Sequence, residues 1–115
     1  MKDYHKEIVA ALKTTGLPVH YELFLHSGLQ TPCISYMEIS NIDEMNGNTH
    51  GYSRISYQVK VWDNNIQVIQ YHIQDVDRVM RGLGFKRTGS AELHDSNSTM
   101  IQKVNTYELL AYEKY

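Results

Sequence analysis

Apolar and polar residues alternate between residues 54 and 63, and the apolar period then changes at once. Every second residue of this segment, RISYQVKVWD, is apolar, which predicts a strand with one buried face. The apolar residues of that face are Ile55, Tyr57, Val59 and Val61. From residue 66 to residue 83 the apolar residues recur every three or four positions, which predicts a helix of about 18 residues with one apolar stripe.

The corner between this strand and this helix, WDNN, needs no ligand to explain it. The side chain of Asp63, Asn64 or Asn65 can accept hydrogen bonds from the free N–H groups at the helix start. The same N–H groups can bind an anion, but a capping side chain would already occupy them. We therefore interpret the corner as architectural, with Gly82 or Gly84 ending the helix.

The remaining elements follow from the same periodicities. Residues 3–14 carry helical spacing, with Asp3 able to cap the start and Gly16 and Pro18 ending the helix. Alternating or apolar segments predict four more strands, at residues 19–25, 33–42, 84–95 and 100–114.

Residues Asp43–Ser53 lack any apolar period and contain two glycines and two asparagines, so we expect the longest loop of the chain there. A loop of this length is often functional, and its few apolar residues predict that it is mobile in the free protein. Its adaptable side chains suit a protein contact, although a plain solvated loop is the alternative. The candidate contact residues are Met45, Asn46, Asn48, His50 and Tyr52.

The predicted order is α-β-β-β-α-β-β, and short connections between the first three strands indicate antiparallel pairing. Each helix has a single apolar face, so both should cover the same side of one sheet. The sequence thus predicts one domain over residues 1–115, an α+β two-layer sandwich with an antiparallel sheet covered by helices on one face. We expect its central core to contain Tyr57, Val59, Val61, Ile69, Ile73, Val76 and Met80.

Composition excludes several classes of protein. The chain has 115 residues and a formal net charge of −2, and its basic residues are not clustered, which argues against binding to nucleic acid or to an anionic membrane. We find no signal peptide and no apolar run near the ~20 residues that span a membrane. The single cysteine, Cys33, cannot form an internal disulfide, which fits the cytoplasm of the producing cell.

The sequence contains no recognisable catalytic, metal-binding or cofactor-binding motif. Its six histidines show none of the spacings of a zinc site, and no phosphate-binding glycine loop is present. Cys33 should pack as a small apolar residue, and Asp75 and Asp77 should point in different directions on the helix. We therefore predict no catalytic, metal or cofactor residues, although an enzyme assembled from distant residues stays open.

The exposed face of the long helix is unusual because amides and a tyrosine replace the expected Lys and Glu. Such side chains can form interface hydrogen bonds without burying charge. The nine tyrosines of the chain fit the same interpretation, although tyrosine is also common on strands. We predict a protein interface, with a merely polar solvent face as the alternative, at Gln67, Gln70, Tyr71 and Gln74.

The C-terminal half has a sequence pattern that points to a family. The strand ending YQVKVWDNN, the helix containing VDRVMRGLGF and the closing strand NTYELLAY resemble the small tail-terminator proteins of long-tailed bacteriophages and prophages, also known as tail-completion or head–tail joining proteins. The resemblance rests on Val59, Trp62, Asp63, Val76, Asp77, Met80, Leu83, Gly84, Phe85, Tyr107, Leu109 and Tyr112.

This resemblance implies a non-enzymatic assembly protein without cofactors. Such a protein caps the tail tube as a ring, usually of six subunits, and then contacts a head-completion or connector protein. It would be cytoplasmic in the bacterial host and later part of the virion tail, and several family members stay monomeric until they meet the tail. A stand-alone α+β ligand-binding or regulatory domain, or a small enzyme, would be favoured instead by a pocket with convergent polar groups.

Overall fold

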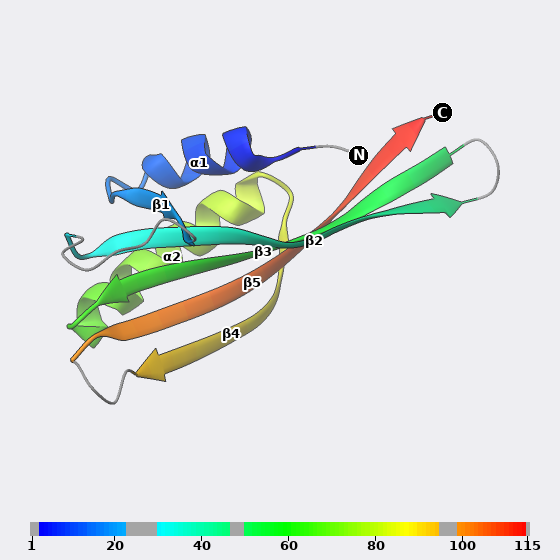
Figure 1. The fold of residues 1–115 in the computed structure, drawn as a ribbon. Coiled ribbons are helices and arrows are strands. Elements are labelled where there is room, and N and C mark those ends of the chain that lie inside the picture. Colours follow the sequence, from blue (N-terminus) through cyan, green and yellow to red (C-terminus); the bar gives the residue numbers. More distant parts are fainter. Residues whose placement is uncertain (1–2, 23–29, 47–49, 95–98, 115) are drawn as a thin grey trace.

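The computed structural model describes residues 3–22, 30–46, 50–94 and 99–114, and their elements follow the predicted order (Figure 1). The elements are α1 (His5–Lys13), β1 (Val19–Tyr21), β2 (Cys33–Asn46), β3 (His50–Asp63), α2 (Ile66–Gly82), β4 (Lys86–His94) and β5 (Ile101–Lys114). The predicted α+β class is confirmed. Neither described helix is long and apolar enough to cross a membrane.

The five strands form one sheet in the order β1-β2-β3-β5-β4. The pairs β2–β3, β3–β5 and β5–β4 are antiparallel, but β1 runs parallel to β2, pairing Val19 with Ile34 and Tyr21 with Tyr36. The sheet is therefore mixed, and the predicted hairpin between the first two strands is wrong. The residues between β1 and β2, 22–32, are numerous enough to return the chain to the same end of the sheet, which a parallel pair requires.

Both helices cover one face of the sheet and share its core. Ile8 and Leu12 of α1 and the apolar stripe of α2 pack in one buried cluster with β2, β3 and β5. The predicted core is confirmed, because all seven of its residues are buried in this cluster. Neither of the described helices lies on the opposite face of the sheet, and we refer to that face as the open face (Figure 1).

The corner between β3 and α2 is built as a helix cap. The side chain of Asn65 accepts hydrogen bonds from the backbone N–H groups of Gln67, at 2.9 Å, and Val68, at 3.4 Å. Asp63 in turn accepts one from the N–H of Asn65. The helix is followed by Gly84, whose φ of +97° favours glycine and turns the chain into β4. The architectural interpretation of WDNN is consistent with this geometry.

Three strands continue beyond the two-layer body and form a projecting arm (Figure 1). The arm comprises residues 41–46 of β2, 50–55 of β3 and 109–114 of β5, which are paired in continuous antiparallel register. The predicted loop Asp43–Ser53 is therefore wrong over most of its length, since it forms the ends of two strands. Hydrogen bonding along both edges of β3 stabilises a strand there without an apolar alternation, which is why the sequence pattern missed it.

Candidate protein interface

The open face of the arm carries an exposed apolar patch. Ile42, Arg54 and Leu110 lie opposite one another across β2, β3 and β5, so their side chains share one face. Ile42 is 51% exposed and Leu110 is 39% exposed. The guanidinium of Arg54 lies 3.1 Å from Glu108, which leaves the aliphatic part of Arg54 between the two apolar residues. We call these three residues the arm patch.

Four of the five sequence-predicted loop residues lie on the strands of this arm. Tyr52 is half-buried on β3, and the register places it two residues beyond Arg54 on the same face. Met45, Asn46 and His50 lie at the strand ends, and their side chains fall outside the described part of the structure. Asn48 lies outside the described residues altogether. The sequence missed Ile42 and Leu110 as interface candidates because both were read as ordinary strand residues.

The second predicted surface is exposed on the outer side of α2. Gln67, Gln70 and Gln74 are exposed, and Tyr71 is 69% exposed with its ring edge-on to His72. This surface belongs to the helical layer, whereas the arm patch lies on the open face of the sheet. The structure therefore does not bring the two predicted groups together, and the protein presents two separate candidate contact surfaces.

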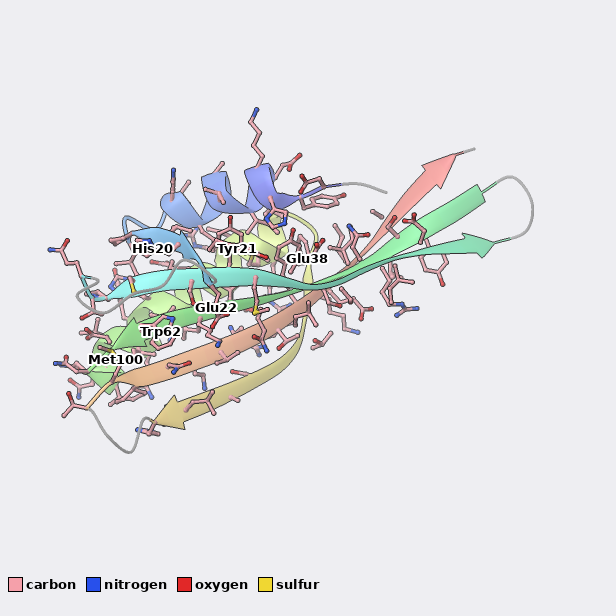
Figure 2. All side chains as sticks on the ribbon, in the orientation of Figure 1. His20, Tyr21, Glu22, Glu38, Trp62 and Met100 are labelled. Atoms are coloured by element: carbon pink, nitrogen blue, oxygen red, sulfur yellow. The ribbon has the colours of Figure 1, made fainter. Side chains whose placement is uncertain are left out.

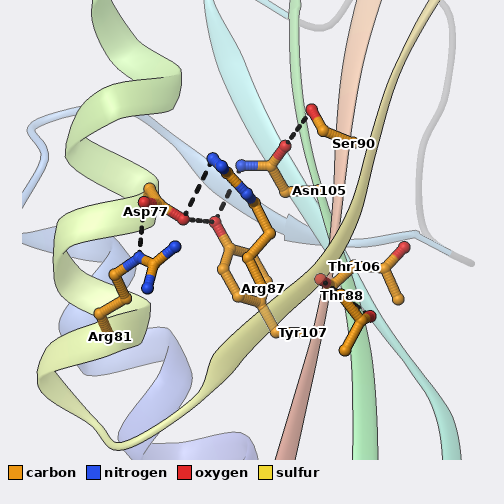
Figure 3. Close-up of polar contacts among 8 residues, drawn as sticks. All are labelled: Asp77, Arg81, Arg87, Thr88, Ser90, Asn105, Thr106 and Tyr107. Atoms are coloured by element: carbon orange, nitrogen blue, oxygen red, sulfur yellow. Dashed lines mark hydrogen bonds and ion pairs between the residues drawn. The ribbon is translucent and has the colours of Figure 1, made fainter.

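A polar network that the sequence did not predict joins α2 to the edge of the sheet (Figure 3). The carboxylate of Asp77 accepts hydrogen bonds from Arg81, at 2.8 Å, and from the hydroxyl of Tyr107, at 3.0 Å. Arg87 of β4 lies 3.6 Å from the same carboxylate. Within the sheet, the side-chain amide of Asn105 donates a hydrogen bond to the Tyr107 hydroxyl, at 2.9 Å, and accepts one from the Ser90 hydroxyl, at 2.8 Å.

The electrostatics of this network keep Asp77 ionised. Partial burial by itself would raise the pKa of Asp77, but the hydrogen bonds from Arg81 and Tyr107 and the charges of Arg81 and Arg87 hold it below its ordinary value. Burial raises the pKa of Tyr107 well above its ordinary value, so its hydroxyl stays protonated and can donate. The network therefore connects α2 to strands β4 and β5 through an ionised carboxylate.

A shallow pocket of about 370 Å³ lies beside the network, and four of its polar residues belong to that network. Asp77, Arg87, Ser90 and Asn105 line it, and each of them is bonded to another member of the network. A ligand would have to compete with these contacts. The pocket therefore favours the network's structural role over ligand binding.

The open face of the body is polar where it approaches β1. Trp62 donates a hydrogen bond from its indole nitrogen to the hydroxyl of Ser35, at 2.8 Å, and Lys60 forms an ion pair with Glu22. Figure 2 places Glu22 and Trp62 at the end of the sheet away from the arm. These polar contacts distinguish this part of the open face from the arm, where Ile42 and Leu110 are exposed.

The thiol and the histidines show no assembled chemistry within the described residues. Cys33 is buried at the start of β2, and burial, followed by the charge of Asp63, raises the pKa of its thiol. A raised pKa lowers the thiolate fraction and hence the nucleophilicity. In the part of the chain that the structure describes, no group of three or more His, Cys, Asp or Glu side chains could hold a metal ion.

No known family model matches the sequence, and no curated protein is significantly similar to it. Among solved structures, the chain resembles one chain of a structure described as "Virion of native gene transfer agent (GTA) particle". The TM-score is 0.67 at 10% sequence identity, and the alignment covers 92% of this chain and 84% of that chain. At this identity the likeness establishes the fold: the protein shares the α+β fold of a chain in that virion particle.

Proposed function

We propose that the protein is a structural component of a phage-type virion that caps the tail tube as an oligomeric ring and joins it to the head connector. The observation that supports this most directly is the fold likeness to a chain of a virion particle, which extends over nearly the whole of both chains. The sequence resemblance to tail-terminator proteins supports the same function, and it rests on residues of β3, α2, β5 and the turn between α2 and β4.

The arm is the structural feature that best fits an assembly role. Exposed apolar side chains that are grouped on a projecting element mark protein contact sites more often than isolated ones. The arm patch has this character, with Ile42 and Leu110 exposed on the same face. Burying it against another protein would remove apolar surface from water, which favours association.

The Gln-rich face of α2 gives the protein a second contact surface. A ring between a tube and a connector needs subunits that contact different partners through different surfaces. The arm patch and the residues Gln67, Gln70, Tyr71 and Gln74 lie in different layers of the fold. We propose that the two surfaces, together with Met45, Asn46, His50 and Tyr52 of the arm and with Asn48, serve the tail tube protein, the head-completion protein or a neighbouring subunit.

In this proposal residues 1–115 act as one domain without enzymatic activity, cofactor, nucleic-acid specificity or membrane association. The subunit would be synthesised in the cytoplasm of a bacterial host as a monomer or weak oligomer. It would assemble into a ring of about six subunits, as the resemblance implies, and then remain in the virion tail.

Inactivation of the gene in the strain that encodes it provides the test. Particles released from that strain would be imaged by electron microscopy, with and without the wild-type gene supplied in trans. We expect unjoined heads and tails of irregular length without the protein, because nothing would stop tube growth or complete the joint. Joined particles of normal tail length in the absence of the protein would contradict the proposal.

A further inference from the structure

The first half of α2 presents an exposed surface without formal charge. Residues 66–74 contain no Asp, Glu, Lys or Arg, and the first turn has none of the acidic residues that are enriched at helix starts. Charges begin at Asp75, and Arg78 and Arg81 then pair with carboxylates of the same helix, at 3.4 and 2.8 Å. Because interface cores are depleted of charge, the first half of α2 has the composition of a contact surface.

Tyr71 is the large apolar group of the Gln-rich face of α2. Among the exposed large apolar side chains of the described residues it is the most exposed, at 69%. Gln67, Gln70 and Gln74 beside it are exposed as well. Tyrosine is over-represented among the residues that dominate binding energy, since its ring buries a large area and its hydroxyl can keep a hydrogen bond.

The arm patch has the chemistry that this face requires in a partner. Amides and an aromatic ring cannot neutralise a buried charge, so the partner surface must bring no unpaired charge into the contact. In the arm patch Ile42 and Leu110 are apolar, and the guanidinium of Arg54 lies 3.1 Å from the carboxylate of Glu108. Glu44 of β2 lies two residues beyond Ile42 toward the tip, at the rim of such a contact, where polar groups are usual.

The two surfaces also match in size. Ile42, Arg54 and Leu110 lie across three neighbouring strands, which spans about 10 Å, close to the diameter of a helix with its side chains. The arm segment of each strand, such as residues 41–46, extends about 20 Å, and the charge-free residues 66–74 extend about 13 Å. A helix can therefore lie on the open face of the arm along its whole charge-free half.

Within one subunit these surfaces cannot meet, because they lie on opposite faces of the sheet. Helix α2 packs on the face opposite to the arm patch, and the arm projects beyond the two-layer body (Figure 1). The molecule measures 52 × 26 × 22 Å, so the arm extends along its longest axis, where a second copy can reach it. Every copy carries both surfaces, and one contact can therefore repeat from copy to copy.

We infer that the Gln-rich face of α2 in one subunit docks on the arm patch of a second copy, with Tyr71 against Ile42, Arg54 and Leu110. This inference rests on the proposed function only for the ring itself. The contact joins two different surfaces, so it is heterologous and generates a ring when the rotation between copies closes. It removes apolar surface of both copies from water and places an aromatic ring beside a guanidinium, which is a favourable cation–π arrangement.

Cross-linking of cysteine variants tests the contact. Leu110→Cys and Gln70→Cys place one thiol in each surface, whereas the native Cys33 is buried. An equal mixture of the two purified variants would be treated at high concentration with a short bis-maleimide, which tolerates a range of thiol spacings. We expect a mixed dimer from the mixture and none from either variant alone or from the wild type. Lys6→Cys, on the exposed surface of α1, replaces Gln70→Cys as the matched control and should give no dimer.

Second substitutions in the Gln70→Cys chain test the chemistry of the contact. Tyr71→Ala should lower the yield of the mixed dimer about tenfold, whereas Tyr71→Phe keeps the ring and should preserve the yield. Equal yields for these two variants would contradict the role of the ring.

A charge variant tests the requirement for a neutral surface. Gln67→Lys brings an unpaired charge into the contact beside Arg54 and should abolish the mixed dimer. Gln30→Lys makes the same change at an exposed position outside both surfaces and should leave the yield unchanged. Equal yields for the two lysine variants would exclude the Gln-rich face from the contact. Circular dichroism verifies that each variant is folded.

The double variant Gln70→Cys/Leu110→Cys distinguishes a ring from a dimer. Repetition of the head-to-tail contact should give a ladder of linked species that ends at a closed ring. A ladder that stops at the dimer would show a reciprocal twofold contact, and Leu110→Cys that links to itself would show that two arms meet. Either result would overturn the inference, as would absence of the mixed link both in solution and in released particles.

Mass spectrometry of released particles separates this inference from the proposed function. If the double variant is present in particles but is linked there to a different virion protein, or is not linked, the proposed function stands and the inferred contact is wrong. If the protein is absent from particles, the proposed function is wrong and the link in purified protein decides the contact alone.

Discussion

The hydroxyl of Tyr107 lies 3.0 Å from the carboxylate of Asp77, so a side chain of β5 donates a hydrogen bond to the middle of α2. Thirty residues separate the two in sequence. The same hydroxyl accepts a hydrogen bond from Asn105, at 2.9 Å. Tyr107 therefore connects the neutral amide in the sheet to the charged carboxylate on the helix.

Replacement of Tyr107 by Phe should destabilise the protein. Phe keeps the ring but leaves the amide of Asn105 and part of the Asp77 carboxylate without their partner, and a lost bond to a charged group costs about 1–3 kcal/mol. Urea unfolding followed by circular dichroism measures this loss. Tyr71→Phe removes an exposed hydroxyl and should change the free energy of unfolding by less than about 0.5 kcal/mol. Equal stability of the two variants would mean that the Tyr107 bond contributes nothing.

The contribution of Asp77 should disappear in acid. Its pKa in the folded protein lies below its ordinary value, which is about 3.9 in an unfolded chain. The stability gained from the ionised carboxylate is therefore complete above that unfolded value and is lost as the pH falls through the lower folded value. We expect the stability difference between the wild type and Asp77→Asn to be constant from pH 7 to about pH 5 and to shrink below about pH 4. A difference that is independent of pH would rule out this linkage.

How far the sequence predicted these features depends on the range of the interaction. The alternation in β3 and the stripe of α2 are local patterns, and they located the core. They limited the helix cap to Asp63, Asn64 or Asn65, and the structure shows that Asn65 is the cap. The Asp77–Tyr107 bond joins distant segments, so no local spacing could reveal it. The arm was missed for a related reason: its strands are held by backbone pairing to β5, which follows more than fifty residues later.

The parallel pairing of β1 shows a second limit of sequence reasoning. Alternation predicted a strand at residues 19–25, of which the structure shows Val19–Tyr21 as β1, while residues 23–25 lie outside the described residues. Alternation predicts a strand but not its direction. The connection of residues 22–32 is of a length that permits either direction.

The two candidate contact surfaces differ in how far the sequence could predict them. The helical period predicted that the Gln-rich face of α2 is exposed. The grouping of Ile42 with Leu110 depends on the register of three strands, which the sequence does not reveal.

Truncation of the core stripe should weaken the fold. Ile73 and Val76 of α2 pack in the buried cluster with β3, and Ile73→Ala or Val76→Ala removes apolar contacts and leaves a cavity. We expect a loss of roughly 1–4 kcal/mol in the free energy of unfolding. Gln70→Ala, on the exposed face of the same helix, is the control and should be close to neutral. Unchanged melting temperatures for both core variants would contradict the packing of α2 on β3.

The thiol of Cys33 should react slowly in the folded protein. Burial raises its pKa and also restricts access, and both effects reduce attack on a disulfide reagent. With Ellman's reagent at pH 8, we expect a rate far below that of the urea-unfolded chain. A Gln70→Cys variant gives the exposed reference on the same protein. Folded Cys33 that reacts as fast as Cys at position 70 would show that this end of β2 opens readily.

The arm patch should be needed for assembly but not for folding. Ile42→Thr and Leu110→Thr, combined in one variant, keep side chains suited to strands while removing most of the exposed apolar surface. Because both side chains already contact water, the free energy of unfolding should change by less than about 1 kcal/mol. Ile55→Thr is the matched control in the same arm: Ile55 is buried on the covered face, so that variant should lose stability.

Complementation of a strain lacking the gene then measures assembly. Wild-type protein should restore joined particles, and the arm-patch variant should be found folded in the cell extract but absent from purified particles. The variant has lost most of the apolar surface whose burial would favour association, whereas its buried core is unchanged. If the variant enters particles as efficiently as the wild type, the arm patch is not a contact surface, and the Gln-rich face of α2 becomes the place to look for the partner.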